Sequence, residues 1–134
     1  MSNYAHLNLK DDVENMAERF GLAPDLETHF ARKALGVEGG GFSYQRYAPG
    51  YRAPVAHRHR THEEVYVVVG GGGRVKIDDD VHPIREWDAL RFAPGTARAF
   101  EAGPDGLELI AIGFGEAGDA EMLEGFWGDE GSPG

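Results

Sequence analysis

Hydrophobic and polar residues alternate with a period of two along most of the chain after residue 41. Because neighbouring side chains of a β-strand point to opposite faces, this alternation is typical of strands with one buried face. The alternating segments are short, and glycine, proline or aspartate residues separate them. They cover residues 42–47, 55–59, 64–69, 74–78, 81–84, 89–92, 97–101 and 107–112. So many short strands predict an all-β protein, a barrel or jelly roll.

Two glycine-rich stretches stand between these segments. The run Gly70–Gly73 separates residues 64–69 from 74–78, and residues 103–106 read Gly-Pro-Asp-Gly. Both stretches predict turns, the first of them a hairpin turn. No Lys-Ser or Lys-Thr follows the first run, so it is not typical of a phosphate-binding loop.

A helical pattern precedes the strands. Its apolar residues recur at helical spacing and a glycine ends it: Val13, Met16, Ala17, Phe20 and Gly21. This spacing predicts a short N-terminal amphipathic helix that covers an apolar face of the sheet. Residues 26–35 are ambiguous between strand and helix, and we interpret His29 among them as a surface residue.

The segment 64–69 is apolar on both faces. Tyr66 lies on the side of Glu64, together with Val68, and three further valines lie on the opposite side. Both faces of this strand must therefore be covered. A barrel interior can take one face, and the other needs the N-terminal helix or a second subunit, which makes a homodimer possible.

The length of 134 residues fits one domain with its own hydrophobic core. We expect an N-terminal arm with the helix over residues 1–24, the barrel over residues 25–115, and an acidic, partly flexible tail over residues 116–134. Within the tail, residues 120–126 can form a turn of helix that docks Phe126 and Trp127.

Composition and charge narrow the function. Cysteine is absent, which excludes disulfides and thiolate metal sites. The chain has no apolar run long enough for a membrane helix and no apolar signal segment at its start, so we expect a soluble, cytoplasmic protein. Its formal net charge of −10 argues against binding to nucleic acid or to anionic membranes.

Three residues have the spacing of metal ligands. His57 and His59 are two residues apart on a predicted strand, so both imidazoles point to the same face. Glu64 can join them if the chain turns between them and starts a neighbouring strand. Two imidazoles and one carboxylate suit zinc, iron, manganese or nickel. The alternative is a pair of exposed histidines at the end of a strand.

These residues resemble the first sequence motif of the cupin superfamily. That motif has a glycine, a His-x-His pair, a glutamate and a second glycine, which correspond here to Gly50, His57, His59, Glu64 and Gly71. The spacing departs from the motif by one residue, between Gly50 and His57. The resemblance covers residues 42–113 and implies a single cupin β-barrel of the jelly-roll type, commonly dimeric, with the histidines facing into the barrel.

The second cupin motif is present only in part. Pro94 and Gly95 keep its turn, but Arg98 stands where the resemblance places the remaining metal-binding histidine. A guanidinium remains protonated and offers only donors, so it cannot ligate a cation and repels one nearby.

Two interpretations of Arg98 follow. In one, Arg98 pairs with Glu64 and supplies the positive charge of the metal, so that no metal is bound. In the other, His57, His59 and Glu64 hold a divalent metal, and Arg98 grips a carboxylate or phosphate of a substrate. His62 would then be a fourth ligand or a base.

The site therefore predicts a small-molecule-binding cupin with polar groups inside the barrel. Other residues that could line its cavity and contact the ligand are Arg46, Tyr66 and Phe100. One hypothesis is a metal-dependent enzyme that acts on a small anionic or oxygenated substrate. The alternative is a non-catalytic ligand-binding or sensing cupin in which Arg98 pairs with Glu64.

Overall fold

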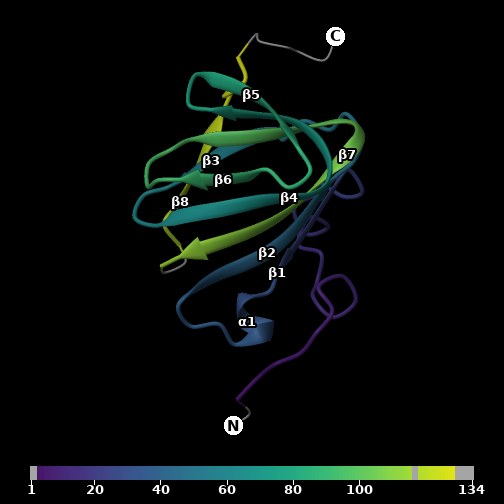
Figure 1. The fold of residues 1–134 in the computed structure, drawn as a ribbon, viewed down its shortest axis with the longest axis vertical. Coiled ribbons are helices and arrows are strands. Elements are labelled where there is room, and N and C mark those ends of the chain that lie inside the picture. The colour runs from purple at the N-terminus through teal and green to yellow at the C-terminus, as the bar shows by residue number, and fades with distance from the viewer. Residues whose placement is uncertain (1–2, 116–117, 129–134) are drawn as a thin grey trace.

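The computed structural model describes residues 3–115 and 118–128 of the chain. Its strands curl around a hydrophobic interior to form a barrel (Figure 1), which confirms the all-β, jelly-roll prediction. The elements are β1 (Leu26–Phe30), α1 (Arg32–Leu35), β2 (Gly40–Tyr47), β3 (Val55–His59), β4 (Glu63–Ile77), β5 (Asp80–Arg85), β6 (Ala89–Phe92), β7 (Arg98–Phe114) and β8 (Ala120–Glu124). None of the helices in these ranges is long and apolar enough to cross a membrane.

The two longest strands, β4 and β7, organise the sheet. They pair antiparallel from Glu63 opposite Phe114 to Ile77 opposite Arg98. β7 also pairs with β2, β4 also pairs with β5 and β6, and β3 lies between β7 and β8. The single residue pair between β3 and β7 joins His57 to Arg98. The topology thus places the first predicted ligand directly opposite the arginine.

The prediction of a hairpin turn at Gly70–Gly73 is wrong. This run lies inside β4, which continues for 15 residues, and the register with β7 shifts on both sides of Gly71. The predicted turn at residues 103–106 is also absent, because these residues lie within β7 opposite the glycine run.

Close approach of the two backbones explains the glycines. A Cβ atom on Gly71 would overlap the carbonyl oxygen of Gly106, and one on Gly73 would overlap the carbonyl oxygen of Glu101. Gly71 also has a φ of 65°, which favours glycine. The run therefore lets two long strands bend together, as glycines do at bulges.

The predicted N-terminal helix is also wrong. Turns occupy residues 9–11 and 16–21, and α1 is the only helix in the described residues. The backbone N–H of Met16 donates to the carbonyl of Thr28 at 2.8 Å, and the side-chain oxygen of Asn15 accepts from the Thr28 N–H at 2.9 Å. These bonds tie the segment to β1 instead of to its own preceding turn. The apolar spacing still marks buried positions, because Val13 and Ala17 are both buried.

His29 is buried and not at the surface as predicted. The residue is only 3% exposed, and its Nδ1 lies 2.8 Å from the carbonyl oxygen of Val13. The imidazole therefore helps to fix the N-terminal arm on β1.

The segment after residue 118 forms a strand and not the predicted turn of helix. β8 pairs with β3 over its whole length, with Leu123 opposite Ala56. Trp127 is buried as expected, and the guanidinium of Arg52 lies 4.2 Å from the centre of its ring. The partial flexibility predicted for residues 116–134 stays a prediction, because residues 116–117 and the last residues of the tail, 129–134, lie outside the described residues.

Aromatic and aliphatic side chains fill the barrel beneath the predicted site. Tyr66, Phe92 and Phe100 contact one another, with ring centres 5.0 to 6.3 Å apart. Val68, Leu107 and Leu109 complete this part of the core. The interior is therefore closed by packing on one side of the site.

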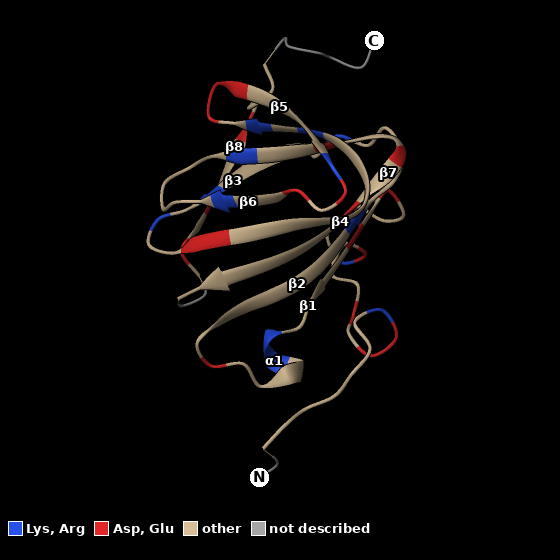
Figure 2. Cartoon of the chain, in the orientation of Figure 1, with Lys and Arg blue, Asp and Glu red and all other residues tan. Residues whose placement is uncertain are grey.

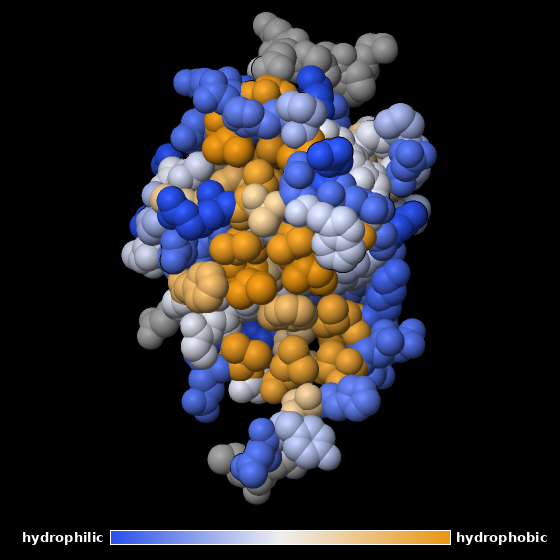
Figure 3. All heavy atoms as spheres, viewed as in Figure 1, coloured by the Kyte–Doolittle hydropathy of each residue, from blue (hydrophilic) through white to orange (hydrophobic). Residues whose placement is uncertain are grey.

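The outer face of β4 carries half-buried valines at Val65, Val67 and Val69. Figure 3 shows apolar side chains gathered on this face of the molecule, whereas Figure 2 shows charged residues mainly on loops, strand ends, β5 and β6. The N-terminal helix does not form, so a second subunit is the other covering that the sequence predicts. The homodimer stays a prediction.

Gly73→Ala tests whether glycine is needed where the backbones of β4 and β7 approach each other. We expect the free energy of unfolding to fall by roughly 1–3 kcal/mol, because the new methyl group forces the paired backbones apart. Urea unfolding followed by circular dichroism measures the change. Gly41→Ala in β2 is the matched control, since a Cβ there meets no atom within 4 Å. Equal losses in both variants would contradict the steric explanation.

Candidate functional site

The predicted ligands meet at one end of the barrel. His57 and His59 come from β3, and Glu64 lies near the start of β4, after the turn at residues 60–62. That turn brings Glu64 to the same side as both imidazoles. The Nε2 atoms of His57 and His59 lie 3.7 and 3.1 Å from Oε1 of Glu64. We call these three residues the inner triad; their potential ligand atoms all lie within 4.8 Å of one another.

Arg98 reaches the inner triad from β7. Its side chain is 1% exposed, and Nη2 donates a hydrogen bond to Oε1 of Glu64, the oxygen that both imidazoles face. Nη1 donates to the carbonyl oxygen of Thr96 at 3.1 Å. The guanidinium also lies 4.8 Å from the ring centre of Phe92. Burial lowers the pKa of Arg98 to about 10, so the side chain remains cationic at neutral pH.

His57 is held in its neutral form. Burial, together with the positive charge of Arg98 and the neighbouring His59 and His62, lowers the pKa of His57 to about 3. A neutral imidazole has one ring nitrogen that can accept a hydrogen bond or bind a metal.

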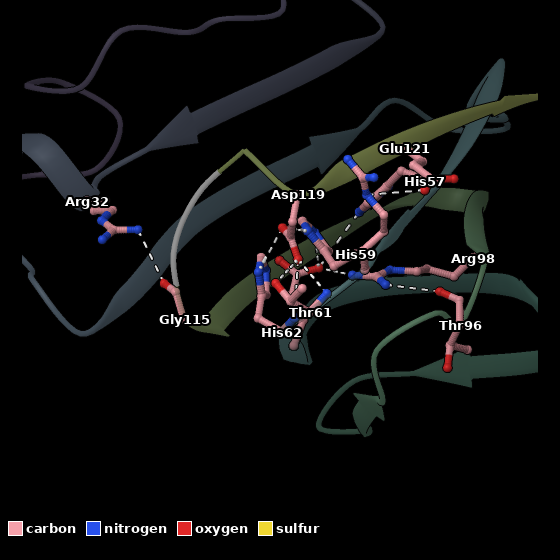
Figure 4. A network of polar contacts seen from close by, with 12 residues as sticks. Arg32, His57, His59, Thr61, His62, Thr96, Arg98, Gly115, Asp119 and Glu121 are labelled. Atoms are coloured by element: carbon pink, nitrogen blue, oxygen red, sulfur yellow. Dashed lines mark hydrogen bonds and ion pairs between the residues drawn. The ribbon is translucent and has the colours of Figure 1, made fainter.

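Asp119 is a central residue that the sequence analysis missed. Its Oδ2 accepts hydrogen bonds from the backbone N–H of Thr61 at 2.9 Å, from the Thr61 hydroxyl at 3.0 Å and from the backbone N–H of His62 at 3.2 Å. Its Oδ1 lies 2.9 Å from Nδ1 of His59 and 2.9 Å from Nδ1 of His62. Figure 4 shows these groups converging on the carboxylate.

The charge of Asp119 is stabilised by these donors. Burial alone would raise the pKa of its carboxyl, but hydrogen bonds from Thr61, His59 and His62 outweigh burial and hold this pKa well below its usual range. No sequence pattern indicates Asp119, because it lies in a glycine-rich acidic segment 57 residues from His62.

His59, His62 and Asp119 form a second cluster of potential metal ligands, which we call the outer triad. Their ligand atoms also lie within 4.8 Å of one another. The two triads share His59, whose Nε2 faces Glu64 and whose Nδ1 faces Asp119.

A cavity of about 290 Å³ opens beside the outer triad. Strands, the α1 region and glycine-rich loops all contribute to its wall, which consists of Phe30, Arg32, Gly41, Phe42, His59, His62, Glu64, Gly113, Gly115 and Gly118. At its edge Arg32 donates to the carbonyl oxygen of Glu38 at 3.1 Å.

The remaining predicted ligand-binding residues do not line this cavity. Tyr66 and Phe100 lie in the core and are 1% and 2% exposed. Arg46 lies near Glu27, with 3.5 Å between Nη1 and Oε2. Of the side chains predicted to contact a ligand, His62 reaches the cavity wall, and Arg98 lies behind Glu64.

The inner triad has the donor set of a metal site, but Arg98 already engages its carboxylate. Its two imidazoles and one carboxylate are a suitable donor set for zinc, iron, manganese or nickel. However, the guanidinium of Arg98 already binds the carboxylate oxygen that both imidazoles face. A cation at this position would lie against a buried positive charge and compete with it for the same oxygen.

Comparison with known proteins agrees with the fold and the motif. A family model of the cupin domain matches residues 43–113, which is more than half of the 134-residue chain. The chain therefore belongs to the cupin family. Comparison with curated proteins gives no significant match.

Several solved structures are similar to this barrel. A cupin protein from Bacteroides fragilis is 25% identical, with a TM-score of 0.69 over 90% of this chain and 91% of that chain. KdgF from Halomonas sp. is 15% identical, with a TM-score of 0.64 over 87% and 97%. A protein described as a predicted oxalate decarboxylase from Thermotoga maritima is 22% identical, with a TM-score of 0.59 over 66% and 79%. The last two likenesses concern the fold alone.

Proposed function

We propose that this chain is a small-molecule-binding cupin that takes a small anionic or oxygenated molecule in the cavity beside His59 and His62. The inner position, where the resemblance implies a metal, is filled by Arg98 paired with Glu64. The observation that carries this proposal is the hydrogen bond from Arg98 Nη2 to Oε1 of Glu64, made by an arginine that is 1% exposed.

The ion pair supports the proposal in two ways. A buried carboxylate needs a positive partner, and Arg98 supplies the charge that a metal would otherwise supply. Once Glu64 is neutralised by this pair, the cavity wall no longer presents a bare negative charge to an anionic ligand. His57 is neutral as well, so the charges of Glu64 and Arg98 largely offset each other.

The cavity wall favours a small anion. Its volume of about 290 Å³ suits a molecule of few heavy atoms. Arg32 is the one Lys or Arg side chain in the described wall, and it can form charge-assisted hydrogen bonds to a carboxylate. Phe30 and Phe42 supply apolar surface. The overall charge of −10 disfavours nonspecific anion binding, so saturable binding requires a dedicated site.

The second candidate is a metal-dependent enzyme that acts on such a molecule. It is favoured by the donor sets of the two triads. A bound divalent metal would polarise a carbonyl or carboxylate oxygen of the substrate. In the inner triad this candidate requires Arg98 to leave Glu64, so the strength of that ion pair discriminates between the two functions.

Arg98→Met tests the ion pair. The variant leaves Glu64 as a partly buried carboxylate without its cation, so we expect the free energy of unfolding to fall by roughly 3–5 kcal/mol. Urea unfolding of chelator-treated protein measures this change.

Arg91→Met is the matched control, because Arg91 forms an exposed ion pair with Glu63 at 3.3 Å. Exposed pairs contribute about 0–1 kcal/mol. If Arg98→Met costs no more than Arg91→Met, the buried pair does not hold the inner position.

Ligand binding can be followed by amide chemical shifts of ¹⁵N-labelled, chelator-treated protein during titration with oxalate, malonate or acetate. We expect saturable shifts around the cavity, at Gly41, Phe42 and Gly113. Arg32→Gln should weaken binding about tenfold, since one charge-assisted contact is lost. Lys33→Gln, an exposed cation on the same short helix, should leave affinity unchanged. Equal effects of the two substitutions, or shifts that never saturate, would speak against this binding site.

A further inference from the structure

We infer that the outer triad is a binding site for a divalent transition metal, displaced toward the cavity from the inner position that Arg98 occupies. The ligand atoms would be Nδ1 of His59, Nδ1 of His62 and Oδ1 of Asp119. Metal binding at this position goes beyond the small-molecule binding proposed above. It rests on the proposed function in two respects: both use the same cavity, and both require Arg98 to remain paired with Glu64.

The spacing of the three atoms suits one ion. Oδ1 of Asp119 lies 2.9 Å from Nδ1 of His59 and 2.9 Å from Nδ1 of His62. Metal–ligand distances of about 2.0–2.2 Å place neighbouring ligand atoms of an octahedral ion about 3 Å apart. Two imidazole nitrogens and one carboxylate oxygen favour zinc, iron, cobalt, nickel or manganese over calcium and magnesium.

Asp119 is oriented for this role by the β3–β4 turn. Three hydrogen bonds, two from Thr61 and one from His62, engage Oδ2. They leave Oδ1 facing the two imidazoles. Supporting hydrogen bonds of this kind fix a ligating carboxylate before the metal binds.

His59 is oriented from the opposite side. Its Nε2 lies 3.1 Å from Oε1 of Glu64 and can donate its N–H there, while Nδ1, which hydrogen-bonds Asp119 in the metal-free site, would release its proton to a bound metal. A histidine that binds a metal commonly donates its other N–H to a carboxylate in this way. Arg98 holds that carboxylate in place. The arginine that blocks the inner position therefore supports the outer one.

The outer triad has access to a ligand. His59 and His62 both line the cavity, and the three side chains retain 10% to 13% exposure. Three protein ligands leave coordination positions open, as in zinc sites that bind a further molecule.

Titration of tag-free, chelator-treated full-length protein with Co²⁺ tests the inference, followed by visible absorption and calorimetry. We expect one equivalent to bind. His62→Gln and Asp119→Asn should each weaken binding at least tenfold. His57→Gln, which changes the inner triad alone, and His82→Gln, which changes an exposed histidine, should leave the affinity within about twofold.

The opposite pattern would overturn the inference: loss of binding in His57→Gln with retention in His62→Gln places the metal in the inner triad. Absence of Co²⁺ binding to the unaltered protein overturns it as well. Melting of the metal-free variants checks folding, and if Asp119→Asn unfolds because the turn is lost, His62→Gln decides. Since the carboxylate titration uses metal-free protein, a failure there concerns the proposed function and not the metal site.

Discussion

A guanidinium buried among aromatic side chains loses its hydration, and only a well-placed anion can offset a loss of several kcal/mol. Arg98 is in this position: Phe92 and Tyr66 flank its charge, and Glu64 accepts its hydrogen bond. The remaining features of the site depend on this contact. It directs the glutamate toward β7 and leaves His59 with one nitrogen facing Glu64 and the other facing Asp119, while burial and the charge of Arg98 keep His57 neutral. The barrel thus keeps the residues of the first cupin motif and sets the charge of Arg98 against its glutamate.

Two long, bent strands, β4 and β7, and the last strand, β8, position these residues. β4 and β7 carry Glu64 and Arg98 near their ends, and the glycines in their middle allow the paired backbones to approach each other closely where the register shifts. β8 pairs with β3, and the residue just before it, Asp119, fixes the β3–β4 turn. Trp127, packed under Arg52, holds the other end of this strand. The C-terminal segment is therefore part of the site and not an appendage to it.

The period-two alternation predicted the all-β barrel, because the alternation of side chains along a strand can be read from the sequence without knowing which strands pair. The inner triad was predictable for the same reason. The His-x-His spacing places both imidazoles on one face of a strand, and a turn between His59 and Glu64 brings the glutamate to that face. Long-range backbone contacts were not predictable. The glycine run has the composition of a turn, and only the approach of β7 shows that it continues a strand. The N-terminal spacing is helical, yet bonds to Thr28 outweigh it. Asp119 acts on residues far away in the sequence, so no local pattern marks it.

The central claim is that Arg98, and not a metal, occupies the inner position. A crystal structure of protein soaked in Co²⁺, with anomalous scattering measured above the cobalt edge, tests it most directly. Our account predicts that the guanidinium of Arg98 is hydrogen-bonded to Glu64 and that no anomalous peak lies between His57, His59 and Glu64, with any bound cobalt at His59, His62 and Asp119. An anomalous peak within the inner triad, with the guanidinium turned away from Glu64, would contradict it.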